Sequence, residues 1–498
     1  MRDPVTETFV TLLERYLPDR LSTILVPKLL ALLSILANKD GSKHAERTAL
    51  LAFSIRIGSA ALAFISQIIL ARSMGEFEYG IFVFVWVFVI LAGNLSCLGF
   101  HTVVIRVIPQ YINTKDNALV RGLTTTSRIV ALGVATLIAI IGVIAIYAFE
   151  DTIPYYYLIP IILGCCALPM IALGDVLDGT ARANNWPIVA MSPTFIIRPS
   201  LIIIFVLGVL LFGEQPDAKT ALLAALAAAY ITTLGQFVMI LRKIKTRFSE
   251  VDDESSSTQS ADKNIRQWDV KKWFALSLPI FIIEGFYYLL TNADVIIVGF
   301  FLEPNRVAVY FAAAKTMALV HFIYFAVKAG AAPTFAQLVA EGKMDDLNSF
   351  AKQTARWTLI PTILLGGLVL LLGQFLLSMF GSAFIDGYPV MMILFIGILA
   401  KSLIGPGEVL LTMAGKQKVC VMVYAVALTA NLALNITLIP IYGITGAAFA
   451  TTGAMILEAI LLFFTIKSHL GIHMFALAPS QKVQDQSASV NPNGEPRP

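Results

Sequence analysis

The feature that most constrains this chain is a series of apolar runs longer than about 18 residues, the length at which an α-helix crosses a membrane. Only 14% of the residues are charged, whereas soluble globular proteins carry roughly 25%. Several runs are longer than a bilayer needs, so we expect tilted helices. The sequence therefore predicts an all-α polytopic membrane protein with about twelve spans, at residues 48–70, 79–100, 123–149, 155–178, 187–212, 219–241, 271–300, 307–332, 354–380, 387–413, 417–440 and 443–467.

The distribution of lysine and arginine predicts how these spans are oriented, because cytoplasmic loops collect basic residues. With both termini in the cytoplasm, the cytoplasmic segments hold 28 of the 36 basic residues. The six outer loops then hold only three, which are Arg72, Lys219 and Arg306. We therefore expect both termini to lie in the cytoplasm.

The first 47 residues leave two interpretations open. Residues 22–38 are apolar but short, and Pro27 and Lys28 interrupt them. An interfacial amphipathic helix fits this pattern, and a thirteenth span is the alternative. We favour the interfacial helix, because an extra span would invert every loop and break the charge pattern. The hydrophilic start has no apolar core with a cleavage site, so we expect no cleaved signal peptide.

The chain also repeats itself. Residues 70–82 resemble residues 298–310, and Gly174–Leu177 recurs as Gly407–Leu410. Each half then has six spans in the same order and orientation, which is a parallel repeat about an axis along the membrane normal. We predict five parts: a cytoplasmic N-terminal segment (1–47), an N-lobe (48–241), a charged cytoplasmic linker (242–270), a C-lobe (271–467) and a disordered cytoplasmic tail (468–498).

Ionisable side chains inside the predicted spans are candidates for function, because charge in hydrocarbon is costly unless it has a role or a partner. Four cations stand out, namely Arg56, Arg198, Lys315 and Lys401. The planar fork of arginine suits the oxygens of a diphosphate. We therefore predict that these four residues give a cavity a positive surface for an anionic substrate.

The second half instead carries oxygen ligands for a small cation. The candidates are Glu284, Asp294, Asn431, Asn435 and Thr451. Carboxylate, amide and hydroxyl oxygens suit a hard cation such as Na⁺, and a carboxylate such as Glu284 could instead hold a proton. Aligning the two halves pairs Arg56 with Glu284 and Arg198 with Asn431.

A purely structural interpretation of the same residues stays open. Arg56 and Glu284 could form an ion pair between helices, and buried asparagines often only join membrane helices. Nearer the inner ends of the spans, acidic residues are expected to cap an inner gate beside Arg182 and Lys416. These residues are Asp175, Asp178 and Glu408.

Several functional classes lack their motifs. The chain has no Gly-rich phosphate loop of the ATPase kind, no Ser/His/Asp or Cys/His arrangement, and no long outer segment for a glycosyltransferase site. We therefore do not expect an enzyme, a cofactor, a metal centre or a nucleic-acid partner.

Over residues 48–467 the chain resembles bacterial oligosaccharide flippases of the multidrug/oligosaccharidyl-lipid/polysaccharide exporter superfamily. The most specific part is the string Asn431…Asn435…Pro440…Tyr442-Gly443…Gly446…Ala450-Thr451. More degenerate parts are Leu70–Phe82 with Met74-Gly75 and Tyr79-Gly80, Leu278-Pro279, Asp294 followed by Ile296–Gly299, and Tyr310 with Lys315.

The resemblance implies a V-shaped fold like that of MATE transporters, with two pseudo-symmetric six-helix lobes. It implies alternating access, driven by an ion gradient or the membrane potential. The substrate would be undecaprenyl-diphosphate-linked oligosaccharide, moved across the bacterial inner membrane for exopolysaccharide, capsule or O-antigen synthesis. The implied partners are this glycolipid, the bilayer, and a polysaccharide polymerase and copolymerase.

The resemblance also implies a coupling ion, Na⁺ or H⁺. In the related lipid II flippases a Na⁺ site uses an acid of span 7, a polar pair of span 11 and a threonine of span 12. Glu284, Asn431 with Asn435, and Thr451 fit that pattern, although an acid in place of Asn435 would make the site stronger. The chain lacks the two extra C-terminal spans of those flippases, which argues against lipid II as its substrate.

Two other functions are weighed against the flippase. A drug/cation antiporter of the same superfamily would favour acids and aromatic residues in the first-half cavity, where this chain has Arg56 and Arg198. A non-transporting scaffold of a polysaccharide assembly complex predicts instead that the intramembrane charges can be neutralised without loss of function.

Overall fold

The structure, a computed structural model, describes residues 44–254 and 267–478, and the side chains of residues 58–246 and 267–478. Every element of these residues is helical, and eleven helices are long and apolar enough to cross a membrane. The first predicted span, 48–70, falls within helix α3 (His44–Met74), whose part Gly58–Met74 is also apolar. The predicted all-α polytopic class is confirmed. The alternatives for residues 22–38 lie outside the described residues.

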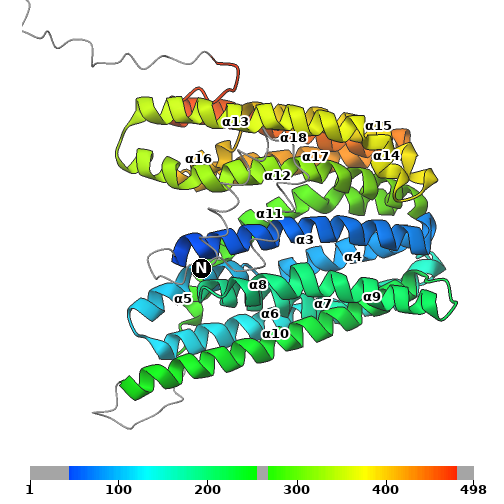
Figure 1. The fold of residues 1–498 in the computed structure, drawn as a ribbon, viewed down its shortest axis with the longest axis horizontal. Helices are drawn as coiled ribbons and strands as arrows, with labels where there is room; N and C mark the ends of the chain where they lie inside the picture. The colour runs from blue at the N-terminus through cyan, green and yellow to red at the C-terminus, as the bar shows by residue number, and fades with distance from the viewer. Residues whose placement is uncertain (1–43, 255–266, 479–498) are drawn as a thin grey trace, which may run out of the picture. The chain divides into compact units, whose positions relative to one another are not determined.

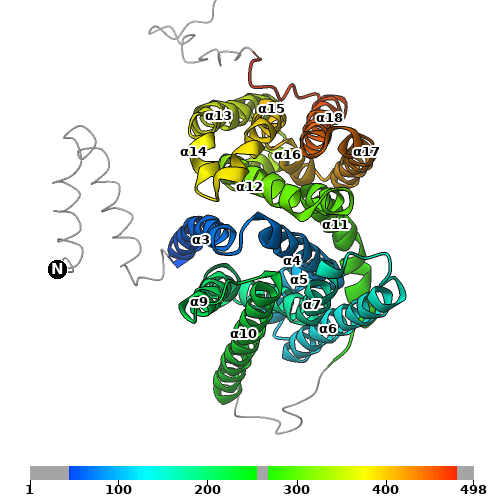
Figure 2. The ribbon, with the colours of Figure 1, turned by 90° about the vertical axis from the view of Figure 1, so that its right-hand side faces the viewer.

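The chain divides into two compact units. Among the described residues, the first contains those up to Ser73 and those within Ala92–Phe281. Its helices are α3, α5 (Phe100–Asn113), α6 (Asn117–Ala148), α7 (Tyr155–Ala183), α8 (Pro187–Ser192), the π-helix η2 (Pro193–Ile197), α9 (Arg198–Leu211) and α10 (Ala218–Glu254). Helix α7 is central, since it packs against α5, α6 and α10 (Figures 1 and 2).

The second unit contains Met74–Leu91 and the chain from Ile282 onward. Its helices are α12 (Pro304–Ala340), α13 (Met344–Leu371), α14 (Gly373–Ser378), the 3₁₀-helix η3 (Ser382–Gly387), α15 (Tyr388–Ile404), α16 (Gly407–Met413), α17 (Gln417–Tyr442) and α18 (Ile444–Leu470). Helix α18 packs along α15 and α17, and α13 packs along α12 and α15 (Figures 1 and 2). Helices α4 (Glu76–Ser96) and α11 (Val270–Phe301) contribute to both units.

Two predicted spans are broken helices. The fifth runs as α8, η2 and α9, with Pro193 starting the π-helical turn and Pro199 following it, since proline removes a backbone hydrogen bond. The tenth breaks between α15 and α16, where Gly405 has a φ of 64° and Pro406 follows. A backbone with positive φ favours glycine, so the sequence ends α15 at this point.

Three segments differ from the prediction. The segment after the second span, predicted to be cytoplasmic, contains α5, whose apolar face packs around the fully buried Trp273. Helix α10 continues to Glu254, well into the predicted linker that starts at 242. The tail predicted as disordered from 468 is ordered to 478: Ile472 and Met474 are buried, and Arg356 Nε donates to the carbonyl oxygen of Ala476 at 2.9 Å. Buried apolar side chains and backbone hydrogen bonds hold this segment in place.

Candidate functional site

The second unit contains a cavity of about 420 Å³ between helices α11, α12, α15, α16, α17 and α18. Its wall combines aromatic and aliphatic side chains with six charged groups. The cations are Lys315, Lys328 and Lys401, and the acids are Asp294, Glu408 and Glu458. The charges balance in number, so their pairing determines what the cavity offers a ligand.

Asp294 is the centre of the first polar cluster. The residue is 7% exposed, and its Oδ2 accepts a hydrogen bond of 2.6 Å from the hydroxyl of Tyr310. The hydroxyl of Thr451 donates to the same oxygen at 3.4 Å, while Oδ1 accepts the backbone N–H of Val295 at 2.8 Å. Helices α11, α12 and α18 thus converge on one carboxylate.

Two fully buried amides, Asn431 and Asn435, lie one turn apart on α17. Asn435 Nδ2 donates to the backbone oxygen of Asn431 at 2.8 Å and to its Oδ1 at 3.1 Å. Asn431 Nδ2 and Asn435 Oδ1 have no hydrogen-bond partner among the described residues. An unpaired buried polar atom costs roughly 1–3 kcal/mol, so the arrangement is suited to a further ligand. Asn431 and Thr451 both line the cavity.

The close approach of α17 and α18 depends on a glycine in the turn region. A Cβ atom on Gly446 would lie 2.3 Å from the carbonyl oxygen of Leu438. Glycine at 446 therefore lets the start of α18 pack closely against the end of α17. Asn431 and Thr451, which both line the cavity, lie on the two helices that this turn joins.

Two lysines of the cavity are paired. Lys401 Nζ lies 2.8 Å from Glu458 Oε1, and Lys328 Nζ lies 3.1 Å from Glu408 Oε1. The hydroxyl of Tyr324 donates to Glu408 Oε2, and the ammonium of Lys401 lies 5.3 Å from the centre of the Tyr324 ring. Glu408 lies in the first turn of α16, where the helix dipole favours an acid. These pairs join α12, α15, α16 and α18.

Lys315 is different, because it forms no ion pair with a described residue. Its side chain is exposed to the cavity, and its Nζ lies 4.9 Å from the centre of the Phe311 ring. It also interacts electrostatically with Asp294. Lys315 is therefore the cation of this wall that remains available to an anionic ligand.

In the first unit, Arg198 is 7% exposed, and its side chain bonds to residues of the same unit. Its Nε donates to the hydroxyl of Thr232 at 3.4 Å, and Nη2 donates to that of Thr233 at 3.5 Å. The guanidinium lies against Gly174, where a Cβ would come within 3.3 Å of Nη2. Neighbouring Asp175 accepts a hydrogen bond from Asn94 at 3.4 Å. Arg198 thus ties α9 to α7 and α10.

The structure brings some predicted residues together and separates others. Asp294 and Thr451 are joined by a hydrogen bond, Asn431 lines the same cavity, and Asn435 is bonded to Asn431. Glu284 lies ten residues before Asp294 on α11, about 15 Å away along the helix axis, and does not line the cavity. The side chain of Arg56 lies outside the described residues.

One inner acid has the expected neighbour and another does not. Asp178 does pair with Arg182, at 2.5 Å. Glu408 pairs with Lys328 rather than with the expected Lys416, because the first turn of α16 faces α12. Glu458 and Tyr324 belong to the site although no pattern in the sequence predicted a role for them. A charged side chain within an apolar span is a signal that could have identified Glu458. The sequence could not have shown that its partner is Lys401, because that residue lies on another helix.

Comparison with known proteins is informative at the level of family and fold. Residues 47–339, more than half of the chain, match the family described as polysaccharide biosynthesis protein. Residues 279–437 match the family described as MatE. The search of curated proteins gave no match.

Several solved structures are similar. An inward-facing MATE multidrug resistance transporter of the MOP superfamily has a TM-score of 0.64 at 13% identity, covering 83% of this chain and 94% of that one. The lipid II flippase MurJ, inward closed, has a TM-score of 0.64 at 15% identity, with 84% and 87% covered. A MOP superfamily transporter from Pyrococcus furiosus has a TM-score of 0.56 at 14% identity, with 88% and 97% covered. At these identities the similarity shows the fold, which is that of a MATE-like transporter.

Proposed function

From the premise that the chain belongs to the polysaccharide biosynthesis protein family, we propose that it is a flippase. Its substrate is undecaprenyl-diphosphate-linked oligosaccharide, which it moves across the bacterial inner membrane for polysaccharide synthesis. Both termini lie in the cytoplasm, as the charge distribution indicates. The similarity to a lipid II flippase supports a polyprenyl-diphosphate substrate, since that protein acts on a lipid-linked molecule.

The observation that carries this proposal is the cavity in the second unit, where Lys315 and Asp294 remain outside the ion pairs. Lys315 presents a single positive charge beside the aromatic ring of Phe311. Such a group can meet the diphosphate of the substrate. The aromatic side chains of the cavity wall can pack against the apolar faces of sugar rings.

Asp294 supplies the site for the coupling cation in this proposal. Its carboxylate and the hydroxyls of Tyr310 and Thr451 provide oxygen atoms, and Asn435 Oδ1 is a buried oxygen without a hydrogen bond in the described structure. Oxygen ligands with one negative charge suit Na⁺, and Asp294 alone suits a proton. The oxygen atoms of Tyr310 and Thr451 beside the carboxylate support Na⁺.

Lys315 and Asp294 also give substrate and cation a means of coupling. The positive charge of Lys315 opposes the binding of a cation at Asp294, with which it interacts electrostatically. A diphosphate bound at Lys315 cancels that charge, so a cation binds Asp294 more readily. By reciprocal linkage, each ligand then favours the binding of the other. We assign Lys401 and Arg198, by contrast, to holding helices together.

The test uses a strain depleted of the chromosomal protein and complemented with variants. Asp294→Asn and Lys315→Gln should accumulate undecaprenyl-diphosphate oligosaccharide that a lectin added to spheroplasts cannot reach. The matched control is Glu303→Gln, an exposed acid at the start of α12, which should behave like the wild type. Normal lectin access in both site variants, at normal protein levels, would reject the assignment of these residues.

The MatE match favours one alternative, a MATE-type drug/cation antiporter. Glu408 and Glu458, two of the three cavity acids, are already balanced by lysines, which leaves one carboxylate for a cationic drug. Inverted membrane vesicles can decide between the two functions. Uptake of ethidium into these vesicles by the wild-type protein, together with normal glycolipid in the depleted strain, would establish the antiporter and overturn the flippase.

A further inference from the structure

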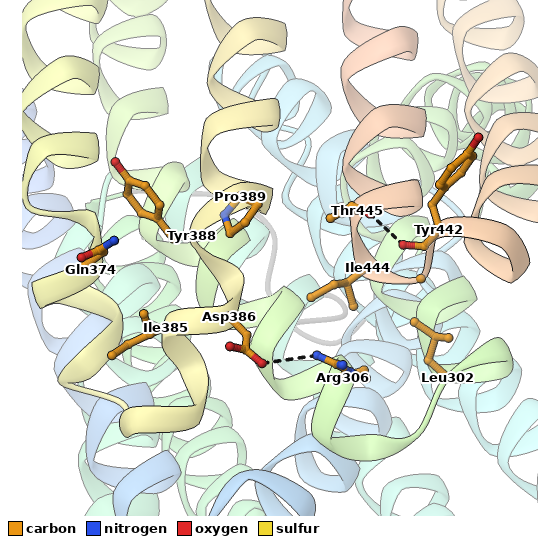
Figure 3. Close-up of a pocket in the computed structure, with 11 residues that line it drawn as sticks. Leu302, Arg306, Gln374, Ile385, Asp386, Tyr388, Pro389, Tyr442, Ile444 and Thr445 are labelled. Carbon is orange, nitrogen blue, oxygen red and sulfur yellow. Dashed lines mark hydrogen bonds and ion pairs between the residues drawn. The ribbon is translucent and has the colours of Figure 1, made fainter.

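A second hollow, here named the outer groove, lies at the end of the second unit that carries the predicted outer loops. Its volume is about 560 Å³, and three turns form it: α11 to α12, α14 to α15 and α17 to α18. Figure 3 shows Tyr388 and Tyr442 at opposite sides of the view, with Ile444 and the pair of Arg306 and Asp386 between them. The groove is separate from the Asp294 cavity, because the two share no lining residue.

The polar groups of the outer groove are electrically balanced and accessible. Arg306 Nη1 lies 3.6 Å from Asp386 Oδ2, and the two side chains are 50% and 70% exposed. Such a long, exposed pair contributes little to stability, so both groups are free to bind a ligand. Gln374 adds an amide that both donates and accepts hydrogen bonds.

This combination matches a carbohydrate. A sugar ring offers hydroxyls that donate and accept, which suit a guanidinium, a carboxylate and an amide together, and an apolar C–H face that suits tyrosine. An isolated phosphate would instead be repelled by Asp386, whose charge cancels that of Arg306. The balanced charge therefore favours a neutral polyhydroxyl ligand over an anionic one.

We propose that the outer groove binds sugar residues of the transported glycan. This inference rests on the proposed function for which glycan is bound. That the ligand is a sugar is argued from the side chains of the groove alone. The groove would hold the oligosaccharide on the outer face while the diphosphate leaves the cavity. Helix α12 connects the two sites, because Arg306 lies one helical turn from Tyr310, the donor to Asp294.

The test measures binding of free oligosaccharide to the purified full-length protein in detergent. Mild acid releases the oligosaccharide from the polyprenyl diphosphate of the producing strain, so the probe has neither lipid nor phosphate. Saturation-transfer NMR should show binding to the wild type and to Glu303→Gln. Asp386→Ala and Tyr442→Ala should bind at least about tenfold more weakly, a loss of about 1.4 kcal/mol. Unchanged melting temperatures would show that these exposed positions do not disturb the fold.

Three outcomes would overturn the inference: no binding to the wild type, equal binding to Asp386→Ala, or displacement of the sugar by short-chain phosphatidylethanolamine. The last would identify the groove as a phospholipid headgroup site. Lectin access in the depleted strain separates this inference from the proposed function. Flipping without oligosaccharide binding rejects only the groove, whereas binding with normal glycolipid access after depletion rejects only the flippase.

Discussion

The pair of Lys401 and Glu458 gives the sharpest test of how charge is arranged in the second unit. Glu458 is 1% exposed, the Lys401 side chain is 16% exposed, and their atoms are 2.8 Å apart. At this distance the attraction is about 6 kcal/mol for an effective dielectric constant of about 20. Removing one member of a buried pair leaves an uncompensated charge and typically costs about 3–5 kcal/mol.

Glu458→Gln should therefore destabilise the second unit by about 3–5 kcal/mol. For a unit of this size that loss corresponds to a fall in melting temperature on the order of 10 °C. The double variant Lys401→Met/Glu458→Leu removes both charges and should recover most of the lost stability. Thermal unfolding in detergent, followed by tryptophan fluorescence, gives the melting temperatures of the purified wild type, of Glu458→Gln and of the double variant.

The exposed pair of Lys343 and Glu341, 2.7 Å apart, is the matched control. Water screens it, so Glu341→Gln should leave the melting temperature unchanged. A double variant that is no more stable than Glu458→Gln would refute the reasoning, since the second substitution should remove the charge that the first leaves uncompensated. The double variant should also retain polysaccharide export. A double variant that is stable but does not export polysaccharide would show that Lys401 is one of the substrate-binding residues.

Three further predictions concern the cluster on α17 and α18 and the core of the first unit. Gly446→Ala should destabilise the protein by at least about 2 kcal/mol through the clash with the Leu438 carbonyl oxygen, whereas Gly367→Ala, which meets no atom within 4 Å, should not destabilise it; equal melting temperatures would contradict this. Asn435→Asp should raise the apparent Na⁺ affinity of transport about tenfold, because a second carboxylate joins Asp294, and unchanged Na⁺ dependence would argue against this site. Trp273→Phe should cost about 1–2 kcal/mol in chemical unfolding, since it removes the 3.1 Å hydrogen bond to the Tyr111 hydroxyl and leaves that hydroxyl without its donor; a loss near zero would show that the bond is not needed.

Features that depend on local spacing could be predicted from the sequence. Asn431 and Asn435 are four residues apart, so they share a helix face wherever the helix packs. Thr451 follows after a short turn that Gly443 and Gly446 permit. Apolar length alone located the spans, because each span must satisfy its backbone within one helix.

Features that depend on rotation between distant helices could not be predicted. Glu284 and Asp294 lie on the same span, and sequence reasoning placed Glu284 first in the ion site. At 100° per residue, ten residues turn the side chain to a face about 80° away. Only packing decides which of the two faces meets Tyr310 and Thr451, and it selects Asp294.

The charge that the cavity wall offers a ligand is the clearest example of a feature that the sequence could not predict, because counting charged residues does not give it. Sequence reasoning took Lys315 and Lys401 together as a positive surface. In the structure Glu458 neutralises Lys401 and Glu408 neutralises Lys328, and both partners come from other helices. The charges that remain outside these pairs are one lysine and one carboxylate, Lys315 and Asp294. Since the paired groups cannot respond to a ligand without losing their partners, the electrostatic response of the wall is concentrated on these two side chains.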